Sequence, residues 1–310
     1  MSVLSAVKNN AHNAQGFASR FRGAFQYGAL FLLLVLTAGV LPSLGQSLNW
    51  EGQTGVFVTP LAYTVPSSKK GLGKPTVAYH FLNGGKVLGN FHQASLTVGA
   101  LGRTEFGYTR DLHSQGSTAG LSSLWGNGFN SFHGKVNIVP ENYAKRKWLP
   151  AISGGFVART QVYNVGGWIE GKRTNNADFY VVASKTITET KHLPIVLNAG
   201  YKATNASVLG LAGNAPAYRG RAFGAAAFVL KGPAKSSIIL GSEVLQESRD
   251  VQALSGAIVP TTITYAARIV PLAERKFNID FGVAQAANHI LPGVNLYARH
   301  QFALGISYGF

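Results

Sequence analysis

The residue types that most often carry enzymatic chemistry are present in this chain, but none of them forms a complete catalytic pattern. Gly305, Ser307 and Gly309 spell the G-x-S-x-G motif of hydrolases that use an activated serine. That motif requires a strand, a sharp turn and a following helix. Here the chain ends one residue later, inside a stretch of alternating apolar and small residues. We therefore interpret the three residues as the small face of a strand.

The remaining candidates for a reactive site are weak. The histidines show no H-E-x-x-H spacing, and residues 71–74 lack both the length and the Ser or Thr of a phosphate-binding loop. The chain has no cysteine, so a thiolate nucleophile and a zinc-thiolate site are excluded. A serine meeting His80 or His133 across two strands would make a membrane-embedded lipid hydrolase, which is a minor alternative. We expect no enzyme, no metal and no cofactor.

Charged residues are few and strongly unbalanced. The 310 residues include 28 Lys+Arg against 12 Asp+Glu, a net charge of +16, although only 13% of the chain is charged. The basic residues form no stripe interleaved with aromatic side chains, so we expect no nucleic-acid partner. They gather between apolar blocks, at residues 69–74, 145–147, 231–235 and 275–276. This pattern fits contact with anionic lipid headgroups, or a rim that collects an anionic solute or glycan.

The N-terminal region has the pattern of a secretory signal peptide. Lys8, Arg20 and Arg22 precede an unbroken apolar or small run at residues 28–41. This run is shorter than the ~20 residues that a membrane-spanning helix needs, and small residues follow it. We expect residues 1–45 to be removed, with a single anchor helix as the alternative. Residues 46–74 would then form a periplasmic or lumenal lead-in to a domain at residues 75–310.

After residue 50 the apolar residues recur with a period of two, which predicts strands. In the last block, five large apolar residues share one face, while the other face carries small or polar residues. Strands with an apolar outer face and a polar inner face are typical of barrels that cross a membrane. Such a sheet must close, because an open edge would leave backbone groups unpaired in hydrocarbon. We therefore expect an all-β fold, a closed antiparallel transmembrane β-barrel.

Thirteen alternating blocks are present, but the connections between them indicate an even number of barrel strands. Counting back from the C-terminus, long and short connections alternate, and short turns belong on the periplasmic side of such barrels. The block at residues 54–59 breaks this alternation, so we assign it to the lead-in. About 12 strands follow, and 10 to 14 remain compatible with the pattern.

The alternation also predicts which polar residues face the lumen. Six are basic and four are acidic, so the lumen would be mildly cationic. Because rings of charge set selectivity, we expect a narrow porin-like channel or export conduit that mildly favours anions. The alternative is a structural or interaction barrel whose lumen is filled by mutual ion pairs and whose outer loops, 113–130 and 204–219, meet a partner. The predicted lumen-facing residues are Arg103, Glu105, Asp111, Lys135, Arg159, Lys202, Glu243, Arg268, Asp280, Arg299 and Gln301.

The chain's end resembles the signal by which the barrel-assembly machinery recognises Gram-negative outer-membrane proteins. The residues that carry this resemblance are Phe302, Leu304, Ile306, Tyr308 and Phe310. The resemblance implies that the protein lies in the cell outer membrane, with that machinery and outer-membrane lipid as partners.

Three internal segments resemble known envelope families. Residues 147–152 (KWLPAI), 176–185 (NADFYVVASK) and 198–205 (NAGYKATN) resemble the uncharacterised domain-of-unknown-function 3034 family of secreted, presumed outer-membrane β-proteins. Residues 52–60 (GQTGVFVTP) are similar to the lead-in of outer-membrane proteins tied to exopolysaccharide loci. Neither resemblance implies catalytic residues.

Overall fold

The computed structural model describes residues 47–114, 126–162, 174–188, 193–211, 213–248, 256, 258–271, 276–285, 289–291, 294–295, 297 and 299–310. The chain divides into two compact units, Met1–Leu41 and Pro42–Phe310. The first unit and the expected signal peptide lie outside the described residues. In the described part of the chain, no helix is both long enough and apolar enough to cross a membrane.

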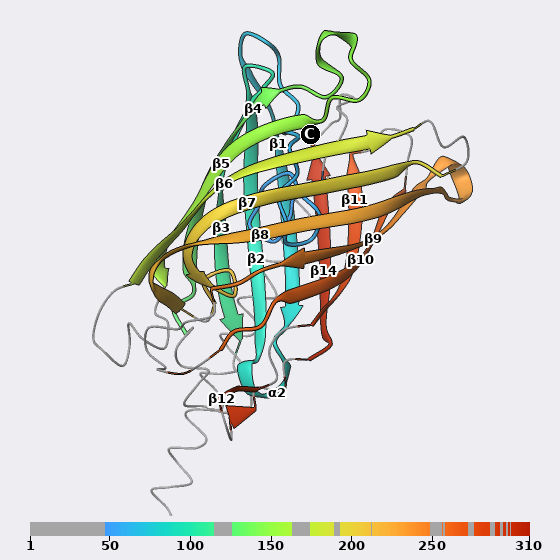
Figure 1. Ribbon diagram of the computed structural model, residues 1–310. Coiled ribbons are helices and arrows are strands. Elements are labelled where there is room, and N and C mark those ends of the chain that lie inside the picture. The colour runs from blue at the N-terminus through green and yellow to red at the C-terminus, as the bar shows by residue number, and fades with distance from the viewer. Residues whose placement is uncertain are drawn as a thin grey trace, which may run out of the picture. The chain divides into compact units, whose positions relative to one another are not determined.

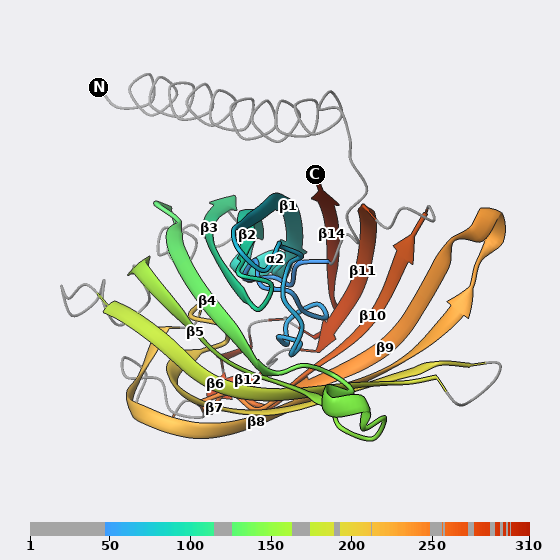
Figure 2. The same cartoon turned by 90° about the horizontal axis from the view of Figure 1, so that it is seen from above.

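Twelve antiparallel strands form one closed barrel (Figures 1 and 2). Each strand pairs with its neighbour in the sequence, and β1 closes the barrel against β14 from Thr76↔Gly309 to Leu82↔Ala303. The predicted closed barrel of about twelve strands is therefore confirmed. The strands are β1 (Leu72–Asn83), β2 (Asn90–Ala100), β3 (Thr104–Ser114), β4 (Phe129–Val139), β5 (Ala151–Val162), β6 (Thr174–Ile187), β7 (Ile195–Ser207), β8 (Gly213–Lys231), β9 (Ser237–Leu245), β10 (Thr262–Val270), β11 (Phe277–Gln285) and β14 (Gln301–Gly309).

The two ends of the barrel differ in their connections. One end, here called the turn end, carries the C-terminus, the tight turn 101–103 and two 3-10 turns, η2 (Tyr143–Lys145) and η3 (Pro233–Lys235). Leu101 and Gly102 both have positive φ, the backbone conformation that tight hairpin turns require. The opposite end, here called the loop end, carries α2 (Gly85–Leu88) and a small hairpin of β12 (His289–Leu291) with β13 (Val294–Asn295).

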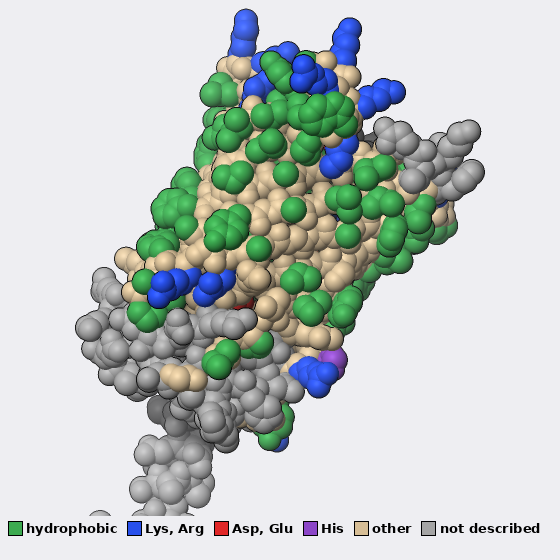
Figure 3. Space-filling view, viewed as in Figure 1, with side chains coloured by type: hydrophobic (Ala, Val, Ile, Leu, Met, Phe, Trp, Pro, Cys, Tyr) green, Lys and Arg blue, Asp and Glu red, His purple; other side chains and the backbone are tan. Residues whose placement is uncertain are grey.

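The outer face of the barrel is apolar around its circumference. Large apolar side chains are exposed on all twelve strands, and Figure 3 shows such side chains spread over the wall between the two ends. A soluble protein rarely exposes so extensive an apolar surface, whereas a barrel in lipid requires one. The architecture is that of an outer-membrane β-barrel. Examples from different strands are Leu72, Leu96, Phe106, Phe132, Phe156, Phe179, Tyr201, Phe228, Leu240, Tyr265, Phe281 and Phe302.

The lumen contains a segment of the same chain. Residues 47–66, here called the inner segment, run inside the barrel before the chain reaches β1 (blue in Figures 1 and 2). The inner segment adds no strand to the barrel, and its only β pairing is two isolated bridges, Leu48↔Thr54 and Gly55↔Pro60. Because its backbone is irregular, its N–H and C=O groups must find partners on the barrel wall.

Candidate functional site: the lumen and its inner segment

On one side of the lumen, a buried ion pair holds the inner segment through its backbone. Glu105 of β3 and Lys135 of β4 are cross-strand neighbours whose charged groups lie 2.8 Å apart. The Glu105 carboxylate accepts hydrogen bonds from the backbone N–H groups of Thr54 and Val65 at 3.0 and 2.8 Å. Lys135 donates to the carbonyl oxygens of Thr54 and Leu61, both at 2.9 Å. The ion pair therefore binds both backbone N–H groups and backbone carbonyl oxygens of the inner segment.

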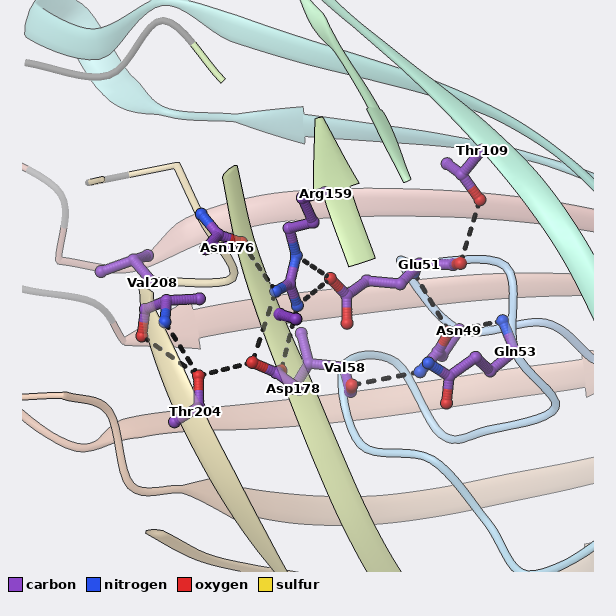
Figure 4. Close-up of polar contacts among 12 residues, drawn as sticks. Asn49, Glu51, Gln53, Val58, Thr109, Arg159, Asn176, Asp178, Thr204 and Val208 are labelled. Carbon is purple, nitrogen blue, oxygen red and sulfur yellow. Dashed lines mark hydrogen bonds and ion pairs between the residues drawn. The ribbon is translucent and has the colours of Figure 1, made fainter. Parts of the chain in front are cut away.

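A second ion-pair network joins the inner segment to β5 and β6. Arg159 donates from Nε to Glu51 of the inner segment at 2.6 Å, and its other nitrogens contact Asp178 and Asn176, each at 3.0 Å (Figure 4). Lys202 of β7 is also paired with Asp178, at 3.2 Å. Arg159 is completely buried. Its guanidinium thus depends on these two carboxylates, because an unpaired charge at this depth is very unfavourable.

On the opposite wall, Glu243 of β9 binds the turn at the middle of the inner segment. Its carboxylate accepts from the backbone N–H of Val58 and from both the N–H and the hydroxyl of Thr59, all at 2.8 Å. These three bonds satisfy a carboxylate that forms no ion pair with the described residues. The turn at residues 58–59 is therefore fixed to β9 as firmly as residues 54 and 65 are fixed to β3.

The start of the inner segment is held by β11 and β14, and residue 56 is held by β10. Arg268 donates to the carbonyl oxygen of Val56 at 2.9 Å and to Asp280 at 2.6 Å. The hydroxyl of Ser47 donates to Asp280 at 2.8 Å and lies 3.3 Å from the hydroxyl of Ser307. Both ends of the inner segment are consequently bound near the turn end of the barrel.

Neutral side chains complete the contacts to the inner segment. Asn137 donates to the carbonyl oxygen of Ala62 at 2.8 Å, Ser153 donates to the same oxygen, and Asn198 donates to that of Pro60 at 3.1 Å. These groups come from β4, β5 and β7, so the contacts run around most of the barrel. Small polar residues on the inner face, which alternation alone predicts, thus serve as partners for an irregular backbone.

Apolar side chains of the inner segment pack in the loop-end half of the lumen. Trp50 and Phe57 are 1% and 2% exposed and belong to one core cluster with Leu209 and Leu211, from the turn after β7. The predicted loop 204–219 is too long, because residues 204–207 belong to β7 and residues 213–219 to β8. Leu209 and Leu211, in the short turn between these strands, fold into the barrel mouth. Of the other predicted loop, residues 115–125 lie outside the described residues. A cavity of about 10 Å³, room for one water, remains beside Tyr180 and the inner segment.

Glu247, which follows β9, fixes the turn that closes this mouth. One of its carboxylate oxygens accepts from the backbone N–H of Val208 at 3.1 Å, and the other has no hydrogen-bond partner. Burial raises the pKa of this carboxyl to about 7, against an opposing effect of Lys202; Asp178 raises the pKa further and Arg159 lowers it. Burial thus disfavours the charged form of the carboxyl that holds the turn at Val208 in place.

The two histidines considered for hydrolysis point into the lumen. His80 is completely buried and packs edge-on against Trp50 and Phe57, with ring centroids 6.2 and 5.8 Å apart. His133 is 2% exposed and lies beside Thr97. Neither side chain faces lipid. Ser307 lies within β14, so the interpretation of the G-x-S-x-G match as part of a strand is confirmed.

The structure brings most of the predicted lumen-facing residues to the inner face. Arg268 is part-buried there, and eight others are buried: Glu105, Asp111, Lys135, Arg159, Lys202, Glu243, Asp280 and Gln301. Arg103 and Arg299 are exposed and lie in a turn and before β14, respectively. They do not join the buried set, because side-chain alternation has meaning only within a strand. The five residues of the predicted assembly signal all lie on the outer face of β14 or at its end.

Three acidic residues of the lumen are absent from the predicted set. Asp178 was missed because residues 177–187 carry apolar residues on both faces, so the alternation did not show which face points into the lumen. Glu51 and Glu247 were missed because they lie outside the strands. With these included, the buried charges of the described residues are seven acidic against four basic. They are Glu51, Glu105, Asp111, Asp178, Glu243, Glu247 and Asp280, with Lys135, Arg159, Lys202 and Lys276.

Comparison with known proteins gives a likeness of fold only. No family model matches the chain, so the resemblance to the domain-of-unknown-function 3034 family is not confirmed. No curated protein sequence matches either.

Several solved outer-membrane barrels are similar in structure. The KdgM porin, solved in complex with disordered oligogalacturonate, has a TM-score of 0.43 and 10% identity over 76% of this chain and 99% of its own. The NanC porin has a TM-score of 0.45 and 9% identity over 76% and 100%. The COG4313 outer membrane channel from Pseudomonas putida F1 has a TM-score of 0.43 and 10% identity over 78% and 96%. These values are too low to transfer a solute, so the fold stated above rests on this chain's own strand pairing.

Proposed function

We propose that this protein is a porin-like outer-membrane channel for small solutes, closed in the described state by its inner segment. One observation carries the proposal: β1 and β14 close the barrel without the inner segment, and the wall behind that segment is polar. Asn, Ser, Thr and charged side chains are hydrated in water as readily as they bind a peptide. Withdrawal of residues 47–66 would therefore leave a water-compatible lumen, as a conducting pore requires.

The second candidate is a structural or interaction barrel whose lumen stays filled. The completely buried Arg159, with its two carboxylate partners, favours this candidate, because breaking such a network is costly. The two candidates differ in one property, which is whether the inner segment leaves the lumen under a membrane potential.

Ion selectivity follows from the charges that remain when the segment moves. Without Glu51, which lies on the inner segment, six buried acidic side chains of the described residues remain against four buried basic ones and the part-buried Arg268, so the described lumen has no anion-selective ring. We therefore propose weak selectivity within the lumen, with any preference for anions arising at the basic turn end. Transport of an anionic solute or export of a glycan would depend on that end. We propose that the barrel-assembly machinery inserts the protein into the outer membrane, and the apolar outer face of β14 supports this proposal.

A reversible lock on the inner segment tests the proposal. The hydroxyl oxygens of Ser47 and Ser307 are 3.3 Å apart, and the natural chain has no cysteine. In the double variant Ser47→Cys/Ser307→Cys, a disulfide would fix the start of the inner segment while β1 already fixes its end. Planar-bilayer conductance would be recorded for the wild type and for the locked variant, before and after reduction with dithiothreitol.

The proposal expects voltage-dependent openings in the wild type, none in the oxidised variant, and their return on reduction. A deletion of residues 47–66 provides the matched open control and should conduct steadily. If the wild type stays silent at every voltage while the deletion variant conducts, the lumen is permanently filled and the structural barrel is the correct candidate.

A further inference from the structure

Every exposed charge in the described part of the chain is basic. Of the described Asp and Glu residues, only Glu141 is even partly exposed, and it is paired with Lys185 at 3.2 Å. The turn end carries most of this charge, and Lys and Arg side chains project from it at the top of Figure 3. The exposed basic residues at this end are Lys69, Lys70, Lys74, Arg103, Lys145, Arg146, Lys147 and Lys231.

Large apolar side chains are exposed beside these basic residues. Leu72 is 67% exposed two positions from Lys74, and Leu101 is 61% exposed two positions from Arg103. A hydrogen bond of 3.0 Å from the Leu101 N–H to the Gly71 carbonyl joins the two turns. The start of β1 and the β2–β3 turn thus each expose an apolar side chain and a cation close together in the sequence.

The connection between β4 and β5 extends this pattern beyond the wall. Its residues 140–150 fold on themselves, with backbone bonds from Asn142 to Leu149 and from Arg146 to Tyr143 at 3.0 and 3.2 Å. Lys185 of β6 braces it by donating to Asn142 at 2.7 Å. The β4–β5 connection carries three consecutive basic residues, 145–147, and Trp148 follows them with 71% of its surface exposed.

We infer that the turn end binds anionic phospholipid headgroups of the membrane leaflet that surrounds it. The cations come from four places along the barrel rim: the start of β1, the β2–β3 turn, the β4–β5 connection and the end of β8. This distribution fits a leaflet rather than one side of a folded partner. Lys and Arg donate to phosphate oxygens, and tryptophan is enriched at the level of the headgroups. A soluble acidic protein would neutralise the cations but would leave Leu72 and Leu101 without apolar cover. The inference holds whether or not the barrel conducts.

Quenching of Trp148 fluorescence in nanodiscs tests this inference. In a Trp125→Phe/Trp168→Phe background, only Trp148 and the buried Trp50 remain. Brominated phosphatidylglycerol and brominated phosphatidylcholine would be compared as quenchers at equal mole fraction. We expect phosphatidylglycerol to be enriched around Trp148, and the enrichment to fall by about tenfold in Lys145→Gln/Arg146→Gln/Lys147→Gln, since each cation near an anionic leaflet adds attraction.

The matched control removes three exposed cations from the loop end, in Lys86→Gln/Arg219→Gln/Arg299→Gln, and should leave the enrichment around Trp148 unchanged. A salt titration of the background protein needs no further variant, because added NaCl should reduce the enrichment as it screens the charges. Equal quenching by both lipids in low salt would overturn the inference. Loss of enrichment in the loop-end control would overturn it too. The inference would also be overturned if soluble polyglutamate protected Trp148 from quenching while the two lipids quenched it equally. That outcome would point to an acidic polypeptide partner.

Discussion

Replacing Arg159 by methionine should release the inner segment from the barrel wall. Methionine keeps much of the side-chain volume but removes the guanidinium that binds Glu51 at 2.6 Å and Asp178 at 3.0 Å. Asp178 retains Lys202 at 3.2 Å, whereas Glu51 keeps no cationic partner among the described contacts. The loss therefore falls mainly on the inner segment and not on the wall.

The expected magnitude follows from the burial of the broken pair. Removing one member of a fully buried ion pair costs about 3–5 kcal/mol, and the lower value applies because Asp178 stays paired. About 3 kcal/mol corresponds to roughly a hundredfold increase in the population whose inner segment has left the lumen. The inner segment of the variant should still be bound most of the time, because the contacts to Glu105 and Glu243 remain.

Maleimide labelling of a single cysteine measures this population. Val58→Cys places the only thiol of the chain at a site that is 7% exposed in the lumen, so labelling requires the inner segment to move. The labelling rate of Val58→Cys/Arg159→Met should exceed that of Val58→Cys by about two orders of magnitude. Adding Glu51→Gln should recover part of the difference, because it removes the stranded charge.

The control for this experiment is Lys185→Met, which breaks a part-exposed ion pair with Glu141. Such pairs are worth about 1 kcal/mol or less, so labelling should rise no more than about fivefold. Equal labelling rates for Val58→Cys with and without Arg159→Met would refute the reasoning, provided that heat-shifted gel mobility shows both barrels folded.

Three further changes have defined outcomes. Because burial raises the pKa of Glu247 from 4.5 to about 7, the folded turn 207–211 favours the protonated carboxyl. The stabilisation of the turn by this protonated carboxyl is complete below pH 4.5 and is lost as pH rises through about 7. Amide hydrogen exchange in residues 207–211 should therefore speed up with pH in the wild type, relative to Glu247→Gln measured at the same pH. Phe281→Arg, on the outer face at the middle of β11, should destabilise the barrel by about 2–4 kcal/mol in urea unfolding from lipid, whereas Leu72→Arg at the rim should cost about 0–1; equal costs would contradict the assignment of the apolar belt. Deletion of Phe310, which packs edge-on against Tyr308, should lower the amount of protein in the outer membrane, and wild-type levels would contradict the assembly-signal hypothesis.

The sequence determined the barrel because its evidence is local. Alternation of large apolar with small or polar residues assigns each strand two faces, and the order of short and long connections sets the number of strands. Even the exclusion of residues 54–59 from the sheet could be predicted, since including them would break that order. Strand ends were less well predicted: β8 begins at Gly213 because its pairing with β7 continues to Ser207↔Gly213, beyond the block at 220–230 where alternation is readable.

The occupied lumen was decided only by the tertiary structure. Residues 47–66 have no periodicity that points to the barrel interior, because an irregular peptide takes its partners from side chains far away in sequence. Thr54 depends on Glu105, Val58 on Glu243 and Ser47 on Asp280. The sequence placed these three acidic residues in the lumen, where they had been expected to pair with other wall charges or to line a pore. Closure of the barrel brings them around one short segment, whose backbone N–H groups donate to Glu105 and Glu243 and whose Ser47 hydroxyl donates to Asp280.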